Sequence, residues 1–391
     1  MGMTTTERAE AWIPRLRAAA TEIEAGRRVP QALANELGAD GFFRMLVPET
    51  LGGGEVHPRT FARTLMALGR GDGATGWIAM TGSTTGLLTA YLADEGAREV
   101  LGGEAHEALA GVFAPTGRAV PATVEGVEGY RLSGRWSFAS GCENAPWRVG
   151  GGLVFDEGAT GPRMTAAGGP EVRSFFFRAE DSQVVDTWKT AGLRGTGSHD
   201  LVVEDVFVPA SRTASLVSDA PRHSGPLYRF PVFGLLATGV ASVGLGIARA
   251  ALEIGEEMAR TKRARGGKKV MGESELVQVE IARAAAEIGA AEAFLFASLD
   301  DAWDAAAAGD ALSHALRARI RLAATHAGQA AASATDRVYH LCGGASIWDA
   351  NPLSRHFRDV HVMTQHIMVS PSTLKPIGRI ALGLPTDVSM L

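Results

Sequence analysis

The spacing of apolar and polar positions divides the chain into three regions. From about residue 4 to 110, apolar residues recur every three or four positions, as in AEAWIPRLRAAATEIEA and FARTLMALG, which predicts helices. From about residue 112 to 211, short β-branched and aromatic runs such as RLSGRWSFAS and HDLVVEDVFVP predict a small antiparallel barrel or sandwich. We therefore expect an α+β protein with an N-terminal α-helical domain at 1–110, a β domain at 111–215 and a helical bundle domain at 216–391.

The third region contains two long stretches of strong helix formers. Residues 273–310 and 311–344 contain no proline, so each stretch predicts a helix of about 50 Å. Their many alanines indicate close packing in a bundle, and their broad apolar stripe indicates that part of the surface is buried against other subunits. The most apolar run, 230–248, is interrupted by Pro231 and four glycines, which favours a buried helix over a membrane span.

Composition and cysteine usage narrow the class of protein. The chain is 46% hydrophobic and 21% charged, with a formal net charge of −5, so a nucleic-acid partner is not expected. Cys142 and Cys342 lie far apart and neither has a CxxC partner, which argues against a disulfide framework and a thiolate zinc site. These features favour a cytoplasmic protein.

The sequence contains partial matches to phosphate-binding, hydrolase and metal-binding motifs, but each lacks a residue or a secondary-structure element that the motif requires. Gly244 and Gly246 occur within a helical pattern without a preceding strand, so they indicate close helix packing and not a dinucleotide fold. The stretch GSTTG has Thr84 where a nucleophile elbow needs serine. On a helix, His361 and His366 would be separated by about 140° and could not share an ion, so we predict no metal site.

Two segments remain candidates for cofactor contact. Residues 260–269, RTKRARGGKK, pack six basic residues into ten, either as a solvated connection or as an anion clamp in which Arg263 grips a phosphate. Residues 134–147, GRWSFASGCENAPW, combine aromatic faces with a serine in a strand. Such a strand serves a barrel edge equally well, or a flat cofactor that needs stacking and a hydroxyl.

Four motifs in order resemble a known family. They are DGFFRMLVPETLGGGEV, GRWSFASG, DTWKTAGLRGTGSHDLVVEDVFVP and GGASIWDANPLSRHFRDVHVMTQH, and together they run along nearly the whole chain. They resemble the acyl-CoA dehydrogenase fold, which implies an N-terminal helical domain, a middle antiparallel β-barrel, a C-terminal four-helix bundle and a homotetramer. GLRGTGSHD and the RDVH to TQH segment are more similar to the flavin-dependent two-component monooxygenases within that fold.

The residue at the position of the dehydrogenase base decides between these branches. Acyl-CoA dehydrogenases need a carboxylate to remove the α-proton of a thioester, and the corresponding place here offers His366. The resemblance therefore implies an oxygenase component that receives FMNH2 or FADH2 from a separate flavin reductase and reacts with O2. Through a C4a-hydroperoxide, it would hydroxylate an aromatic or polycyclic small molecule, with no membrane partner.

The resemblance also implies roles for the candidate residues. His366 would lie near the peroxide or the substrate hydroxyl, where a pKa near neutrality would let it donate or accept a proton. Ser140 would hydrogen-bond the flavin ring close to its reactive nitrogen, and Phe138 and Trp136 would flank the ring. Arg263 would hold the phosphate.

For other residues in the motifs shared with the family, the resemblance implies less specific roles. Gly343 and Gly344 would approach the cofactor across a subunit contact. His361 would be supporting or structural, and His199 would shape the site or pin the bundle. Arg358 would form a structural ion pair.

Residues Asn351 and Arg355 would order the loop before the last long helix.

Three alternative functions stay open: the same fold oxidising an amine nitrogen or a sulfur, an acyl-CoA dehydrogenase with an unrecognised base, and an inactive helical scaffold. The intact GRWSFASG strand argues against the scaffold.

Overall fold

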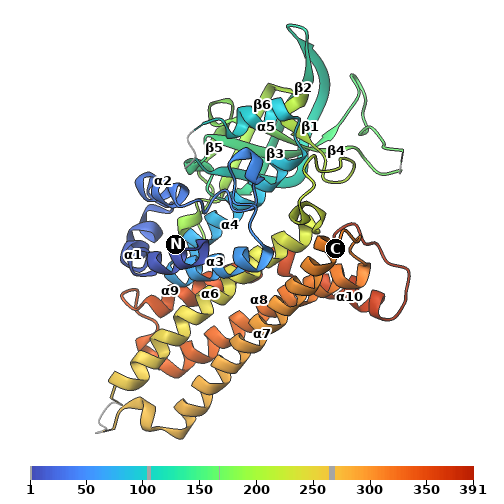
Figure 1. Ribbon diagram of the computed structural model, residues 1–391. Coiled ribbons are helices and arrows are strands. Elements are labelled where there is room, and N and C mark those ends of the chain that lie inside the picture. Colours follow the sequence, from blue (N-terminus) through green and yellow to red (C-terminus); the bar gives the residue numbers. More distant parts are fainter. Residues whose placement is uncertain (1, 104–106, 167, 264–268) are drawn as a thin grey trace.

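A computed structural model describes residues 2–103, 107–166, 168–263 and 269–391 (Figure 1). Helices come first, a sheet follows, and long helices complete the chain. The first helices are α1 (Thr5–Gly26), α2 (Gln31–Ala39), α3 (Pro58–Gly71), α4 (Gly73–Leu87) and α5 (Asp94–Leu101). The later helices are α6 (Val232–Thr261), α7 (Glu275–Ala308), α8 (His314–Cys342), α9 (Pro352–Thr364) and α10 (Leu374–Ala381).

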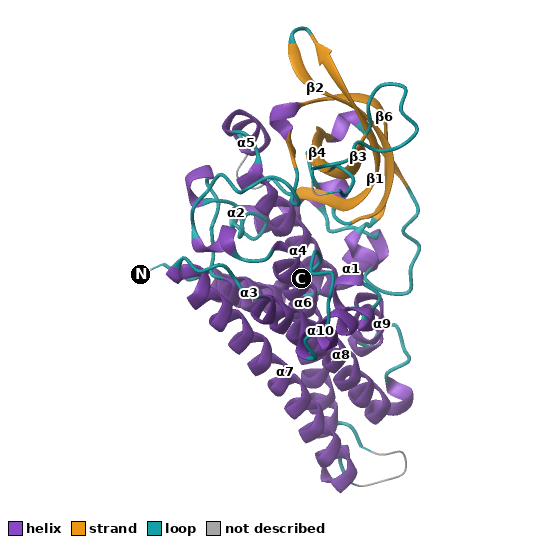
Figure 2. Cartoon of the chain, turned by 90° about the vertical axis from the view of Figure 1, so that its right-hand side faces the viewer, coloured by secondary structure: helices purple, strands orange, loops and turns teal. Residues whose placement is uncertain are grey.

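The sheet is curled and mixed, and it sits at one end of the helices (Figure 2). Its strands are β1 (Leu109–Val124), β2 (Val127–Ala139), β3 (Trp147–Val154), β4 (Val172–Arg178), β5 (Gln183–Val185), β6 (His199–Pro209) and β7 (Thr213–Ala214), in the order β5-β6-β2-β1-β3-β4-β7. The expected antiparallel barrel is wrong in one respect, because β1 and β3 pair in parallel from Leu109↔Trp147 to Ala119↔Val154. Alternation along a strand predicts which residues face the core but not which neighbour the strand joins.

Trp136 fills the inside of the curled sheet. Its side chain is 1% exposed, and its indole Nε1 donates to the Gly151 carbonyl at 2.7 Å. Glycines on the surrounding strands make room for the ring, because a Cβ at Gly117, Gly134 or Gly150 would lie 2.5–2.7 Å from indole atoms. This packing explains why a glycine-rich sheet encloses a large aromatic residue.

Helix α6 is the core helix of the molecule. It is long and apolar enough to cross a membrane by length and composition, but 94% of its most apolar window is buried by the protein's own residues. A Cβ at Gly246 would lie 2.3 Å from the Met66 carbonyl of α3, and one at Gly244 would lie 2.4 Å from Met363 of α9. The prediction that both glycines serve close helix packing is confirmed.

The long helices α6, α7 and α8 run side by side with α9 in a bundle (Figure 1). Helix α7 has 34 residues, as expected, and α8 has 29, slightly fewer than expected. The change from helices to strands falls at Leu109 and the return to long helices at Val232. The domain boundaries at 110 and 215 stay predictions.

Candidate active site

The strand that carries GRWSFASG ends in an exposed aromatic residue. Phe138 is 71% exposed, and its φ of 69° lies in the left-handed region that a bulky side chain rarely adopts. Trp188 lies edge-on to it, with ring centroids 6.1 Å apart. A strained, exposed aromatic residue at a strand end is typical of a ligand contact, because the surrounding structure must hold it there against its own preference.

Two residues further along, Ser140 belongs to a chain of buried hydroxyl groups. The Ser140 Oγ lies 2.6 Å from the Ser198 Oγ, which lies 2.6 Å from the Thr196 Oγ1. Thr196 in turn donates to the Leu193 carbonyl at 2.8 Å. The other end of the chain is Trp77 of α4, whose indole N–H donates to the Ser140 Oγ at 3.0 Å.

The two ends of this chain fix the direction of every hydrogen bond in it. An indole N–H only donates and a carbonyl only accepts. Ser140 therefore donates to Ser198, and Ser198 donates to Thr196. After accepting from Trp77, the Ser140 oxygen keeps one lone pair, which makes it an acceptor toward any ligand beside Phe138.

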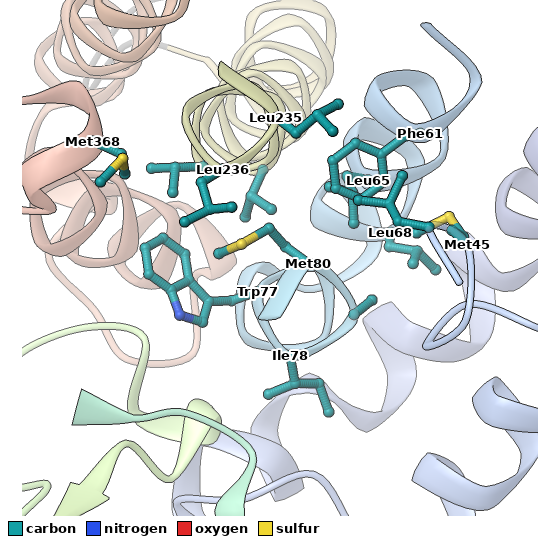
Figure 3. Packing of buried hydrophobic residues seen from close by; sticks show 14 of the residues in the cluster. Met45, Phe61, Leu65, Leu68, Trp77, Ile78, Met80, Leu235, Leu236 and Met368 are labelled. Atoms are coloured by element: carbon teal, nitrogen blue, oxygen red, sulfur yellow. The ribbon is translucent and has the colours of Figure 1, made fainter. Parts of the chain in front are cut away.

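Trp77 also brings the C-terminal segment to Ser140. The ring of His366 packs edge-on against the Trp77 indole, with centroids 5.4 Å apart. Figure 3 places Trp77 of α4, Leu236 of α6 and Met368 within one buried hydrophobic cluster. The two residues predicted as catalytic, His366 and Ser140, thus both contact one tryptophan.

The protonation state of His366 follows from its position before the short 3-10 helix η10 (Ile367–Val369). Its Nδ1 accepts from the Met368 backbone N–H at 3.2 Å, so the proton of the neutral ring sits on Nε2. Burial, reinforced by the positive charge of Arg321, lowers the pKa of His366 to about 4. The expected pKa near neutrality is therefore wrong: His366 is a neutral N–H donor at pH 7.

The end of α9 corrects the geometry expected of the two histidines. Helix α9 ends at Thr364, so His366 is not on the helix that carries His361. The His361 Nε2 lies 2.8 Å from an Asp336 carboxylate oxygen, and its ring packs on Phe357. His361 is structural, as one of its two expected roles proposed.

Asp359 of α9 supports the loop that carries the hydroxyl chain. Its carboxylate is buried and accepts from the Leu193 backbone N–H at 2.5 Å. Burial raises the pKa of Asp359 to about 7, and the nearby Asp72 carboxylate adds to this shift. Leu193 has a φ of 47°, in the left-handed region. The hydrogen bond from its backbone N–H to Asp359 therefore helps to hold this conformation at the end of the row of hydroxyl groups.

Other matching residues have structural surroundings. Arg358 pairs with Glu24 of α1, which confirms its predicted ion pair. Asn351 caps α9 and donates to the Ala345 carbonyl at 2.8 Å, which confirms its role in the preceding loop. The guanidinium of Arg355 lies 3.8 Å from the Glu24 carboxylate of α1. Its expected role in that loop stays a prediction.

His199 lies at the start of β6 near the aromatic pair. Its Nδ1 accepts from the Trp188 backbone N–H at 3.2 Å, and its Nε2 lies 3.5 Å from Glu143. It therefore positions Trp188, which faces Phe138. Trp136, by contrast, is enclosed in the sheet and offers no face to a bound ring, so we do not retain it as a cofactor contact.

The remaining predicted cofactor residues gather elsewhere. Arg263 follows the end of α6, and Gly343 and Gly344 follow the end of α8. Lys262 donates to the Cys342 carbonyl at 3.0 Å, so these two places adjoin each other. The ends of α6 and α8 that they follow lie at the end of the bundle opposite the sheet (Figure 1).

Trp77 was not predicted from the sequence. It lies in GATGWIAMTG, which follows a helical pattern, and a tryptophan in such a pattern indicates a buried core position. Only its contacts with Ser140 and His366 distinguish it. In the described ranges, no group of three or more His, Cys, Asp or Glu side chains is placed to hold a metal ion.

Comparison with known proteins agrees with this architecture. The family model of the acyl-CoA dehydrogenase N-terminal domain matches residues 7–102, and that of the C-terminal domain matches residues 238–371. XiaF from Streptomyces sp., solved in complex with FADH2 and glycerol, superimposes with a TM-score of 0.87 at 29% identity, over 97% of this chain and 95% of that one. Both findings define a protein of the acyl-CoA dehydrogenase fold.

Two curated relatives define the branch. The indole-3-acetate monooxygenase of Acinetobacter baumannii is 34% identical over 95% of this chain and 92% of the relative. The oxygenase subunit HsaA of a flavin-dependent monooxygenase from Rhodococcus jostii is 30% identical over 98% of this chain and all of the relative. The chain belongs to the flavin-dependent monooxygenases of the acyl-CoA dehydrogenase fold.

Proposed function

We propose that this chain is an oxygenase component that uses reduced flavin and O2 to hydroxylate an aromatic or polycyclic small molecule. The observation that carries this function is the meeting of Ser140 and His366 on Trp77, beside the exposed ring of Phe138. Arg321, and not a carboxylate, is the charged group that shifts the pKa of His366. Thioester dehydrogenation lacks its base there.

The residues at the end of β2 fit a planar flavin ring. Phe138 and Trp188 offer an aromatic surface, and Ser140 offers one free lone pair to an N–H of the reduced ring. When bound, the reduced flavin would supply the two electrons that activate O2, one atom of which goes to the substrate while the other leaves as water. Phe138 and Ser140 would hold the ring, and the hydrophobic cluster that contains Trp77 and Leu236 would exclude water from the site.

His366 acts as a hydrogen-bond donor in this function. Its Nδ1 is engaged by the Met368 N–H, so Nε2 is the atom that carries the available proton. A neutral imidazole that keeps this proton across neutral pH orients an oxygen of the substrate or of the oxidant. Because the ring is fixed by Trp77 and Met368, the donor points in one direction.

The proposed function includes a homotetramer, a separate flavin reductase and a cytoplasmic location. We place Arg263, Gly343 and Gly344 of one copy at the cofactor of a neighbouring copy in a homotetramer, because they follow the ends of α6 and α8 that lie opposite the sheet (Figure 1), whereas Ser140 follows strand β2. Reduced flavin, as FMNH2 or FADH2, arrives from a separate reductase. Two free, buried cysteines agree with a cytoplasmic protein.

Replacing Phe138 with asparagine should separate flavin binding from folding. Asparagine tolerates the left-handed backbone better than phenylalanine, so the free energy of unfolding should be equal or higher. Loss of the aromatic contact should weaken flavin binding by about 10-fold. Fluorescence titration with flavin and urea unfolding measure the two effects. Val127→Asn, at the exposed start of the same strand, is the control and should leave flavin affinity unchanged.

Replacing Arg263 with alanine should weaken flavin retention before it affects turnover at saturating flavin. A lost guanidinium–phosphate contact corresponds to about 10-fold in affinity. Gel filtration of the flavin-loaded protein, followed by the flavin-to-protein absorbance ratio, measures retention. Arg260→Ala removes a neighbouring charge that pairs with Glu256 and should have little effect. Equal loss in both variants would mean that overall charge, and not Arg263, holds the phosphate.

Rapid mixing of the reduced-flavin complex with oxygenated buffer tests the function itself. An oxygenase should give a transient absorbance distinct from both reduced and oxidised flavin, followed by hydroxylated product. Direct loss of reduced flavin without a transient, together with rapid flavin reduction by an acyl thioester, would instead establish the dehydrogenase. Product analysis with phenol, amine and thioether substrates separates carbon hydroxylation from heteroatom oxidation.

A further inference from the structure

A buried arginine adjoins His366, and none of the residues that the structure describes gives it a carboxylate partner. Arg321 of α8 is 3% exposed. Its Nη1 donates to the Phe233 carbonyl at 3.1 Å and lies 3.1 Å from the Met368 sulfur. Burial lowers the pKa of Arg321 to about 10, which leaves it charged at neutral pH.

The guanidinium of Arg321 has more N–H donors than hydrogen-bond acceptors around it in the described ranges. A guanidinium has five N–H donors, and a thioether sulfur is only a weak acceptor. Within the described ranges, Arg321 has one oxygen acceptor and no ion pair. Arg148, another buried arginine, donates from Nε and Nη1 to three oxygens, those of Cys142, Ala179 and Ser182. Because an unpaired buried charge is costly, Arg321 is placed to receive an anion.

A cavity of about 200 Å³ opens beside this guanidinium. It lies between α8, the segment after His366 and the end of the chain, and it is lined by Arg321, Ile367, Met368, Ser372, Thr373, Pro376, Asp387, Met390 and Leu391. Asp387, the one acidic side chain of this lining, is exposed and accepts from the Ser389 backbone N–H at 2.9 Å. It shifts neither the charge state nor the hydrogen bonding of Arg321.

Met368 connects this cavity to the site. Its backbone N–H holds His366, and its side chain covers the Nη1 of Arg321. A methionine side chain is flexible and adapts to a ligand at little cost. A ligand that displaced the Met368 side chain from Arg321 would lie next to the segment that holds the imidazole of His366.

We propose that Arg321 binds the carboxylate of the substrate, so that the substrate class is the aromatic acids. This inference rests on the proposed oxygenase function. The cavity is smaller than the roughly 300–1,000 Å³ of pockets for drug-sized ligands, which suits an acid with one or two rings. The apolar walls Ile367, Met368 and Met390 contact the ring, and the planar fork of Arg321 pairs with the carboxylate.

Calorimetric binding to the flavin-loaded protein tests the proposal with matched probes. The acids are benzoate, phenylacetate and indole-3-acetate, and each is compared with its uncharged amide. At least one acid should bind the wild type about 10- to 100-fold more tightly than its amide, as expected for a charge-assisted hydrogen bond. Arg321→Met should abolish this preference, and Arg321→Lys should retain part of it.

Matched variants separate recognition from folding. Arg319→Met removes the same charge from the same helix at an exposed position that pairs with Asp301, and it should keep the preference for acids. Arg321→Met should unfold at the wild-type temperature or above, because replacing an unpaired buried charge by an apolar residue is often stabilising. If Arg321→Met fails to fold, the comparison of Arg321→Lys with wild type decides.

Three results would overturn the assignment. They are binding of acids and amides with equal affinity, an unchanged preference in Arg321→Met, and displacement of the acids by inorganic phosphate regardless of their ring. The rapid-mixing experiment reports separately on the oxygenase function. If the transient absorbance appears but acids bind no more tightly than their amides, only the role of Arg321 is contradicted. If acids bind more tightly but no transient absorbance appears, only the oxygenase function is contradicted.

Discussion

Product formation in a His366→Ala variant is expected to fall by about 100-fold or more, while its flavin affinity stays close to that of the wild type. The imidazole is the N–H donor that Trp77 and Met368 hold in one orientation, and alanine cannot replace it. The flavin contacts that we propose are Phe138 and Ser140, and the substitution does not touch them. Chromatography of product, with reduced flavin supplied in excess, measures turnover, and fluorescence titration measures affinity.

His361→Ala is the matched control for this experiment. It removes an imidazole five residues earlier that pairs with Asp336 on the outside of α9, so turnover should be unchanged. The wild-type rate should also lack a step near pH 6.5, because the folded pKa of His366 is about 4 and the ring stays neutral above it. Equal turnover in His366→Ala and wild type would remove the proposed catalytic role.

The second large effect is expected from Gly192→Ala. A Cβ at Gly192 would lie 2.3 Å from the Arg358 carbonyl oxygen and 2.6 Å from the Asp359 nitrogen. Both are backbone atoms of α9, so neither can turn aside, and the loop or the helix must move. We expect the free energy of unfolding to fall by about 3 kcal/mol, measured by urea denaturation.

The same substitution should lower turnover in the protein that remains folded. Displacing Gly192 displaces Leu193, which ends the hydroxyl chain and receives the support of Asp359. Gly169→Ala is the control, because a Cβ there meets no atom within 4 Å and its φ lies outside the left-handed region. Full activity and stability in Gly192→Ala would contradict the close approach of loop and helix.

The sequence alone predicted the helical and strand regions and the family, because these depend on local periodicity and on short motifs. It did not predict that β3 would run parallel to β1, since strand partners are set by the whole sheet. Trp136 and Phe138 are two residues apart in one motif, yet one fills the sheet and the other is exposed. A bulge between β2 and β6, next to Phe138, interrupts the simple alternation.

Electrostatic properties were the least accessible to sequence reasoning. The pKa of His366 depends on burial and on Arg321, 45 positions earlier in the chain, and no motif encodes that distance in space. No sequence pattern indicates that Asp359 supports Leu193, because this contact depends on the packing of α9 against a loop of the β domain. The sequence does not indicate that Arg321 is buried, because a lone arginine in an alanine-rich helix usually faces solvent.

The hydroxyl chain from Trp77 to Leu193 cannot serve as a proton wire. Conduction along such a row needs each hydroxyl to turn around after a proton has passed, and the row is pinned at one end by a group that never accepts and at the other by one that never donates. The row therefore stays polarised in one sense, as a fixed dipole that ends at Ser140. Protons exchanged during turnover must travel by another route.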